Sequence, residues 1–193
     1  LTQEFRFNDN STRINNFFTE FTAKYELIDG LRLGGGFRFI RNNRNSGYRN
    51  EGRLFGDFSY RHKLDRLTFD YRFRFQNQSA LGDVPDDDVY NKLRLRLKVK
   101  YNIPNWKLDP ALSVEGIYTS AVNNINYVPT ITISERSSGF EKIRFTLGTS
   151  YKINKWLKID GFYRIEREFG SFPLFYDTPA TDYIEEINLT FKL

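Results

Sequence analysis

The sequence predicts an all-β fold: an antiparallel, up-and-down transmembrane β-barrel of about ten strands (range about 8–12) in a single domain over residues 1–193. Three observations lead to this prediction. Apolar and polar residues alternate strictly along the chain, the alternating runs are unusually long, and short and long connections follow each other in turn.

The alternation is clearest in residues 67–76, where every odd position is apolar and every even position is polar. Residues 93–101, 143–147 and 187–193 repeat the pattern. A strand places such apolar residues on one face, whereas a helix would scatter them around its circumference. We therefore expect strands near residues 1–7, 14–27, 31–41, 52–63, 67–77, 90–101, 107–120, 140–152, 157–168 and 182–193.

The length of these runs indicates a membrane environment. Most of them have ten or more residues, whereas strands of water-soluble proteins average about 5–6 residues. A strand that crosses a bilayer at a tilt needs about 9–11 residues. No stretch of the chain reaches the ~18 uncharged apolar residues of a membrane helix.

The connections between the expected strands alternate in length. Short turns are expected at residues 28–30, 64–66, 102–105 and 154–155. Longer polar loops are expected at residues 8–13, 42–51, 78–89, 121–139 and 169–181. Short turns at one end and long loops at the other are typical of outer-membrane barrels, whose short turns face the periplasm.

Two features favour a membrane barrel, with an apolar outside, over a soluble barrel with an apolar inside. Aromatic residues mark the strand ends beside the short turns, as in an interfacial girdle; they are Tyr25, Tyr60, Tyr101, Tyr151, Trp106 and Trp156. Phe at nearly every inward position would also overfill a small soluble barrel, where mixed small and large residues are usual.

Composition excludes several classes of site. The chain has no Cys, no Met and one His, so disulfides, thiolate metal sites and most zinc or haem sites are excluded. Its net charge of +5 from 29 basic and 24 acidic residues is mildly basic, without the clustered charge of a nucleic-acid-binding protein. We expect no cofactor, no metal and no nucleic-acid partner. The chain begins at Leu1, so we expect that a targeting signal has been removed.

The inward face of the expected barrel is rich in charged residues. Like charges two residues apart must be relieved by acids on neighbouring strands, and two interpretations remain open: ion pairs that plug the lumen, or a narrow basic pore that favours small anions. The candidate residues for either are Arg38, Arg72, Arg74, Arg94, Arg96, Arg144, Arg164, Glu20, Asp57, Asp70, Glu115, Asp160 and Glu166.

Catalytic and calcium-binding candidates are weak, so we expect no enzyme. His62 shares the parity of Phe58 and Tyr60, which points it outward beside a short turn, away from any acid or Ser partner. The acidic run at residues 86–88 lacks the spaced ligands and Gly of a calcium loop. Glu166 and Glu168 share one face and could form a carboxylate pair, but nearby arginines favour ion pairing.

Five arginines are expected on the long-loop side, where they could contact lipopolysaccharide phosphates: Arg41, Arg44, Arg49, Arg136 and Arg167. The expected partners are outer-membrane lipid, lipopolysaccharide and other outer-membrane proteins. The last strand, with apolar residues at alternate positions up to Leu193, is similar to the terminal strand that the outer-membrane insertion machinery recognises.

Several segments resemble the outer-membrane family called domain of unknown function 2490. They are residues 17–20 with Lys24-Tyr25, residues 33–41, 71–77, 106–110, 147–152 and 162–166, in this order along nearly the whole chain. The resemblance implies a small barrel in the outer membrane of a Gram-negative bacterium and no established activity. The resulting expectation is a non-enzymatic barrel protein that is structural or an accessory subunit of a larger complex.

Overall fold

The computed structural model describes residues 2–8, 13–44, 47–82, 89–106, 108–128, 131–154, 157–169 and 181–191. Within them, one ten-stranded sheet contains all the regular structure. The strands are β1 (Thr2–Asn8), β2 (Arg13–Ile28), β3 (Leu31–Arg44), β4 (Gly47–Leu64), β5 (Leu67–Ala80), β6 (Val89–Tyr101), β7 (Asp109–Val128), β8 (Ile131–Lys152), β9 (Leu157–Glu168) and β10 (Thr181–Phe191). No helix among the described residues is long and apolar enough to cross a membrane.

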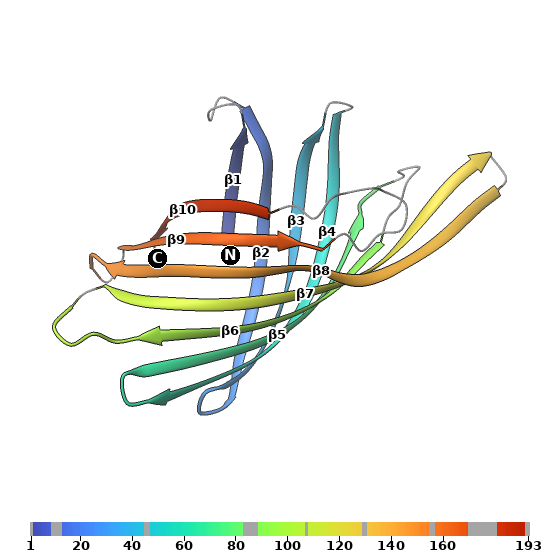
Figure 1. Ribbon diagram of the computed structural model, residues 1–193. Coiled ribbons are helices and arrows are strands. Elements are labelled where there is room, and N and C mark those ends of the chain that lie inside the picture. The colour runs from blue at the N-terminus through green and yellow to red at the C-terminus, as the bar shows by residue number, and fades with distance from the viewer. Residues whose placement is uncertain are drawn as a thin grey trace.

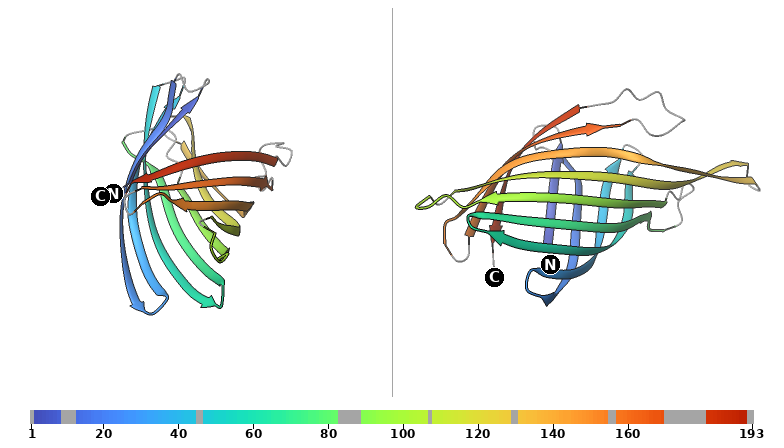
Figure 2. Two further views of the ribbon diagram at one scale, coloured as in Figure 1. Left: turned by 90° about the vertical axis from the view of Figure 1, so that its left-hand side faces the viewer. Right: turned by 60° about the horizontal axis from the view of Figure 1, so that its bottom comes forward.

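The sheet is antiparallel and up-and-down, because each strand pairs with the strands that precede and follow it in the sequence. This confirms the predicted all-β class and strand order. Figures 1 and 2 show that the sheet curls strongly along its length.

These strand pairings do not form the closed barrel that the sequence predicted. Within the described residues, β1 pairs with β2 alone and β10 pairs with β9 alone. In Figure 1 and in the left panel of Figure 2, β1 and β10 run at a wide angle to each other. The two ends of the sheet therefore keep one edge each without a partner strand.

The short turns predicted at residues 28–30, 64–66 and 102–105 lie between strands, and residue 155 of the turn predicted at 154–155 lies outside the described residues. Asp29 and Gly30 connect β2 to β3, and Asp65 and Arg66 connect β4 to β5. Gly30 has a φ of +79°, and a Cβ atom at this position would lie 2.1 Å from the carbonyl oxygen of Arg61. Since the amide of Arg61 donates to the carbonyl of Gly30, only glycine allows the close approach of this turn to β4.

The loop expected at residues 121–139 is instead an extension of two strands. β7 has 20 residues and β8 has 22. β6 pairs with β7 as far as Val122, and β9 pairs with β8 as far as Lys142. The hairpin beyond these residues projects from the sheet (Figure 1), because backbone pairing between β7 and β8 continues without any further neighbour.

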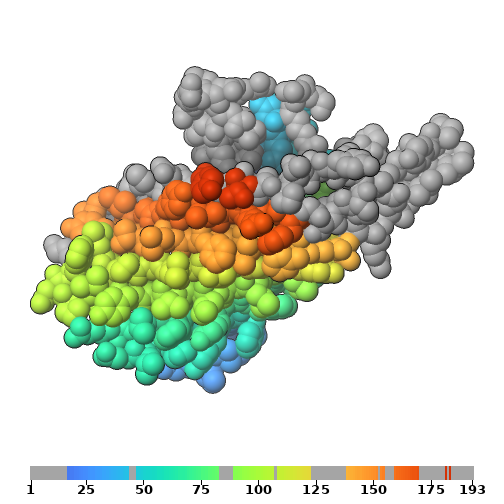
Figure 3. Space-filling model, viewed as in Figure 1, coloured from blue at the N-terminus to red at the C-terminus, as the bar shows by residue number. Residues whose placement is uncertain are grey.

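The two faces of the sheet differ in the exposure of their side chains. Apolar side chains are exposed on one face and polar side chains are buried on the other, the reverse of the usual distribution in a water-soluble protein. Along β5 and β6, apolar residues such as Phe73 and Leu95 are 42% and 63% exposed, whereas Gln76 is 2% exposed on the other face. Figure 3 shows the side chains of β5 to β9 forming one continuous surface. The buried apolar residues Phe18, Ile40, Phe55, Ile117 and Ala121 lie among the charged residues of the other face, which we call the polar face.

Candidate functional site

Strand register brings the charged residues of the polar face into rows across the sheet. Arg72 of β5 lies opposite Arg96 of β6, which lies opposite Glu115 of β7. The same row continues through Arg144 of β8 to Glu166 of β9. Two like charges directly opposite each other destabilise a sheet unless nearby acids compensate them, so this row depends on Glu115 and Glu166.

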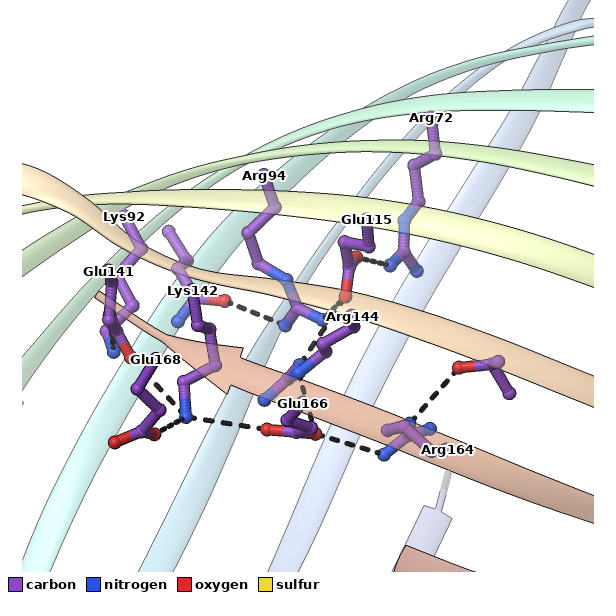
Figure 4. Close-up of polar contacts among 12 residues, drawn as sticks. Arg72, Lys92, Arg94, Glu115, Glu141, Lys142, Arg144, Arg164, Glu166 and Glu168 are labelled. Atoms are coloured by element: carbon purple, nitrogen blue, oxygen red, sulfur yellow. Dashed lines mark hydrogen bonds and ion pairs between the residues drawn. The ribbon is translucent and has the colours of Figure 1, made fainter. Parts of the chain in front are cut away.

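Glu115 binds three arginines from three different strands (Figure 4). Its Oε1 lies 2.8 Å from Nη2 of Arg72, and its Oε2 lies 2.7 Å from Nη2 of Arg94 and 3.4 Å from Nη1 of Arg144. Arg72 is two strands away from Glu115, so the contact requires the side chains to converge over the intervening strand. The polar face is therefore the concave face of the curled sheet.

Glu166 continues these contacts towards β8 and β9. Its Oε1 lies 2.8 Å from Nε of Arg144 and 3.7 Å from Nη1 of Arg164, and its Oε2 lies 3.4 Å from Nζ of Lys142. Figure 4 shows Lys142 between Glu166 and Glu168, with which it also forms an ion pair. Lys142 thus links the middle of the sheet to the long-connection end of β9.

Glu141 completes the set on the side of β6. Its Oε2 lies 2.6 Å from Nζ of Lys92 and accepts a hydrogen bond from the hydroxyl of Thr119, and its Oε1 lies 3.9 Å from Nζ of Lys142. We call the ten connected residues the polar-face network: Arg72, Lys92, Arg94, Glu115, Glu141, Lys142, Arg144, Arg164, Glu166 and Glu168. It contains six cations and four acids, an excess of two positive charges.

The first strands hold their charges in separate pairs. Nε of Arg38 donates to Glu20 over 2.6 Å, and Arg74 makes two bonds of 2.6 Å to Asp57. Each guanidinium also lies over an aromatic ring: Arg38 is 3.8 Å from the centroid of Phe18, and Arg74 is 4.2 Å from that of Phe55. These contacts add cation–π attraction to the ion pairs.

Asp70 is shared by two arginines near the short turns. Its Oδ2 lies 2.6 Å from Nη2 of Arg61, whereas its Oδ1 lies 3.5 Å from Nη2 of Arg96.

Asp160 lies on the same face of β9 as Arg164 and Glu166, opposite Ser150 of β8. The structure therefore gathers the thirteen residues expected to line the lumen on one face, and joins six of them in the polar-face network.

Sequence reasoning missed three network residues, Lys92, Glu141 and Lys142. For Glu168 it favoured ion pairing with nearby arginines, whereas the structure pairs Glu168 with Lys142. Lys92 and Lys142 share the parity of Arg94 and Arg144, so alternation alone could have placed them on this face. Glu141 could not be placed in this way, because the register between β7 and β8 shifts at Ile117 and Tyr118 and leaves Glu141 without an opposite residue.

His62 lies in a stack of aromatic rings near the turn at residues 65–66. Its ring centroid is 4.9 Å from Phe69, 5.8 Å from Tyr60 and 5.8 Å from Tyr71, with small angles between the ring planes. Its Nδ1 is buried and finds no hydrogen-bond partner among the described residues. These neighbours belong to the apolar face, so His62 is separated from the acids of the polar face.

The five arginines expected to contact lipopolysaccharide divide between the faces. Arg41 lies over the ring of Tyr48, 4.2 Å from its centroid, and Arg167 lies 5.9 Å from that of Phe169; register places both on the apolar face. Arg49 lies on the polar face, 3.5 Å from Glu51. The side chains of Arg44 and Arg136 lie outside the described ones.

A metal-binding cluster is not found where the structure can be described. Residues 86–88, the weak calcium candidate, lie outside the described residues. Elsewhere in the described chain, no group of three or more His, Cys, Asp or Glu side chains converges closely enough to hold a metal ion.

A family model described as "Protein of unknown function (DUF2490)" matches residues 1–171, which confirms the resemblance noted in the sequence. No curated protein and no solved structure matches the chain.

Proposed function

Because the chain belongs to the DUF2490 family of proteins of unknown function, and because polar side chains such as Glu115 and Gln76 are buried on one face of its sheet while large apolar side chains are exposed on the other, we propose that it is a β-barrel protein of the bacterial outer membrane. In this proposal the barrel is not an enzyme. It is a structural protein or an accessory subunit of a larger outer-membrane complex, and ion pairs close its lumen.

The inverted burial of the two faces carries the proposal. Glu115 and Thr119 are 6% and 1% exposed, whereas Leu95 and Leu147 are 63% and 59% exposed. In water, an exposed apolar band of this extent would favour aggregation. In a bilayer the same band faces lipid, and the alternation of apolar outside with polar inside is the pattern of transmembrane barrels.

The unpaired edges of β1 and β10 support closure in a membrane. Unpaired backbone N–H and C=O groups cost several kcal/mol each in the hydrocarbon core, about 2–7 kcal/mol by transfer measurements. With ten strands in up-and-down order, β1 and β10 run in opposite directions, so they can pair as antiparallel neighbours. Pairing them removes both edges at once.

Closure can be tested by cross-linking, because the native chain has no Cys. We expect Phe5→Cys in β1 to form a disulfide in bilayers with at least one Cys substituted along β10, at Ile187, Leu189 or Phe191. Phe5→Cys with Phe17→Cys is the positive control, since these residues are paired between β1 and β2. Phe5→Cys with Leu95→Cys is the negative control. Failure of every β10 partner, with a working positive control, would contradict the barrel.

The polar-face network supports a closed lumen. It joins five consecutive strands, β5 to β9; Glu115 and Glu166 at its centre are buried, and most of its other side chains are half-buried. A ten-stranded barrel is only a little wider than the eight-stranded kind that side chains fill. We therefore expect the refolded protein to insert into planar bilayers without conductance steps under a salt gradient.

A narrow anion-preferring channel is the second candidate function, and one observation favours it. The network has six cations against four acids, so an open lumen would attract anions. Reproducible conductance steps with a reversal potential that indicates anion preference would favour this candidate over the plugged lumen.

We also propose that arginines at the long-connection end of the apolar face contact lipopolysaccharide. Arg41 and Arg167 lie against aromatic rings on this face, and no acid of the described chain forms an ion pair with either. Lipopolysaccharide phosphates in the outer leaflet would supply charge-assisted partners at this level.

This contact can be tested with the double variant Arg41→Gln, Arg167→Gln. We expect its thermal midpoint to fall below that of the unmodified protein in micelles that contain lipopolysaccharide, and to match it in phosphatidylethanolamine micelles. Arg66→Gln, at the short turn on the opposite end, is the control. Equal midpoints in lipopolysaccharide would contradict the contact.

A further inference from the structure

Four arginines stand in a square on two neighbouring strands of the polar face. Arg72 and Arg74 of β5 lie directly opposite Arg96 and Arg94 of β6. Directly opposed like charges destabilise a sheet, so each of these guanidinium groups needs a negative partner.

The acids of the described chain compensate three of the four. Asp57 binds Arg74 through two bonds of 2.6 Å. Glu115 divides its two oxygens between Arg72 at 2.8 Å and Arg94 at 2.7 Å.

Arg96 is the exception. The carboxylate with which it forms an ion pair belongs to Asp70, which is 3.5 Å away and also binds Arg61 at 2.6 Å. A separation of 3.5 Å exceeds the range of about 2.7–3.2 Å for a normal N–H···O hydrogen bond. Arg96 is therefore the least compensated member of the square.

Unsatisfied donors provide a second, independent observation. The Nε atoms of Arg72, Arg94 and Arg96 are buried and find no acceptor among the described residues. Nε of Arg74, by contrast, donates to Asp57 over 2.6 Å. Buried donors without an acceptor are rare, because each costs about 1–3 kcal/mol. Three such donors in one square require an acceptor that the described residues do not supply.

The charges around the square indicate that this acceptor is negatively charged. The four arginines and Arg61, which shares Asp70 with Arg96, form their ion pairs within the described chain with three acids, Asp57, Glu115 and Asp70. A water molecule would satisfy the donors but leave the excess charge. An anion would satisfy both requirements.

We propose that the lumen holds a small oxyanion, of the phosphate or carboxylate class, bound between the guanidinium groups of Arg72 and Arg96. Guanidinium groups recognise such anions through two parallel N–H···O bonds. The inference rests on the proposed barrel, because only a closed lumen shields the anion from competing water and salt. It differs from a channel, since the anion stays bound as part of the plug.

The test measures the thermal midpoint of the folded, heat-modifiable band of the refolded protein in detergent. Chloride is replaced stepwise by inorganic phosphate or acetate at constant ionic strength and pH. A ligand that binds the folded state alone raises the midpoint as its concentration exceeds the dissociation constant. We expect a saturable rise of about 5 °C with at least one of the two oxyanions.

Two variants locate the site. Arg96→Gln should abolish the rise of the thermal midpoint. Arg96→Lys keeps the charge but removes the planar guanidinium group, so it should reduce the rise at least several-fold. Arg96→Lys tests the site if Arg96→Gln does not refold. Lys100→Gln is the matched control, because Lys100 lies on the same face of β6 and pairs with Asp109 at 2.6 Å. It should retain the full rise.

The outcomes separate this inference from the proposed barrel. A heat-modifiable protein whose midpoint is equal in phosphate, acetate and chloride would overturn the anion site and leave the barrel standing. A rise that persists in both Arg96 variants would place the anion elsewhere and also overturn the site. Absence of any heat-modifiable form of the unmodified protein would overturn the barrel, and the anion site with it.

Discussion

The polar face and the apolar face of the same sheet tolerate change very differently. On the polar face, Glu115 contacts three arginines and Phe55 packs under Arg74. On the apolar face, Leu95, Phe73 and Gly56 are exposed or have open space beside them. Substitutions on the polar face should therefore break contacts within the protein, whereas substitutions on the apolar face should change mainly its contacts with the surrounding medium.

Glu115→Gln should have the largest effect, because it leaves three arginines of the polar face without their shared carboxylate. Removing one partner of a buried ion pair costs about 3–5 kcal/mol. Urea unfolding of the refolded protein measures the loss. Glu26→Gln is the control, since Glu26 forms an exposed pair with Arg32, and it should leave the transition unchanged. Equal effects of the two variants would show that the polar-face network contributes no more than a surface pair.

Leu95→Lys tests what surrounds the apolar face. In a bilayer, a lysine near the midplane of a barrel costs about 2–4 kcal/mol, falling to about 0–1 kcal/mol near the interface. Leu64 has the same exposure as Leu95, 63%, but lies beside the short turn at residues 65–66. Leu64→Lys should therefore cost much less in folding measurements with lipid vesicles. Equal and negligible costs at both positions would indicate that water, not lipid, covers this face.

Substituting alanine for one glycine on each face compares the packing of the two faces directly. A Cβ atom on Gly36 would lie 2.3 Å from the carbonyl oxygen of Phe21 and 2.7 Å from Cζ of Phe55, whereas a Cβ atom on Gly56 meets nothing within 4 Å. Gly36→Ala should cost about 1–3 kcal/mol. Gly56→Ala should stabilise the strand by about 0.5–1 kcal/mol. Chemical unfolding of both variants checks the difference, and a reversed order would contradict the assignment of the faces.

His62→Ala should have the smallest effect. The ring stacks against Phe69, Tyr60 and Tyr71, and such aromatic contacts contribute about 0.5–1.5 kcal/mol. The change should appear as a small shift of the unfolding midpoint. Loss of a hydrolytic activity in this variant, if the unmodified protein has one, would contradict both the structural role of His62 and a non-enzymatic function.

Alternation in the sequence predicted the strands, their order and the partition of residues between the faces. Residues 67–76 and 93–101 lie within β5 and β6 with their odd positions on the exposed face, and the turns at residues 29–30 and 65–66 lie as expected. The alternation of apolar and polar residues is interrupted at Phe18, which follows Phe17. Phe18 shares the parity of Glu20 and packs under Arg38 on the polar face.

The choice of ion-pair partners could not be predicted from the sequence. Glu115 binds Arg72 across an intervening strand, a contact that depends on the curl of the sheet. The register shift at Ile117 brings Glu141 to Lys92 and Thr119, and the pairing of β7 with β8 continues far into a segment that resembles a polar loop.

The sequence by itself determined the all-β class, the up-and-down order of the strands and the identity of each face, because a period of two residues is a local property of an extended chain. Only the tertiary structure decided which charges meet, where the long hairpin projects and how far the two edges of the sheet lie from pairing. These features depend on twist, curl and register accumulated over ten strands, and a local pattern along the chain contains no information about any of them.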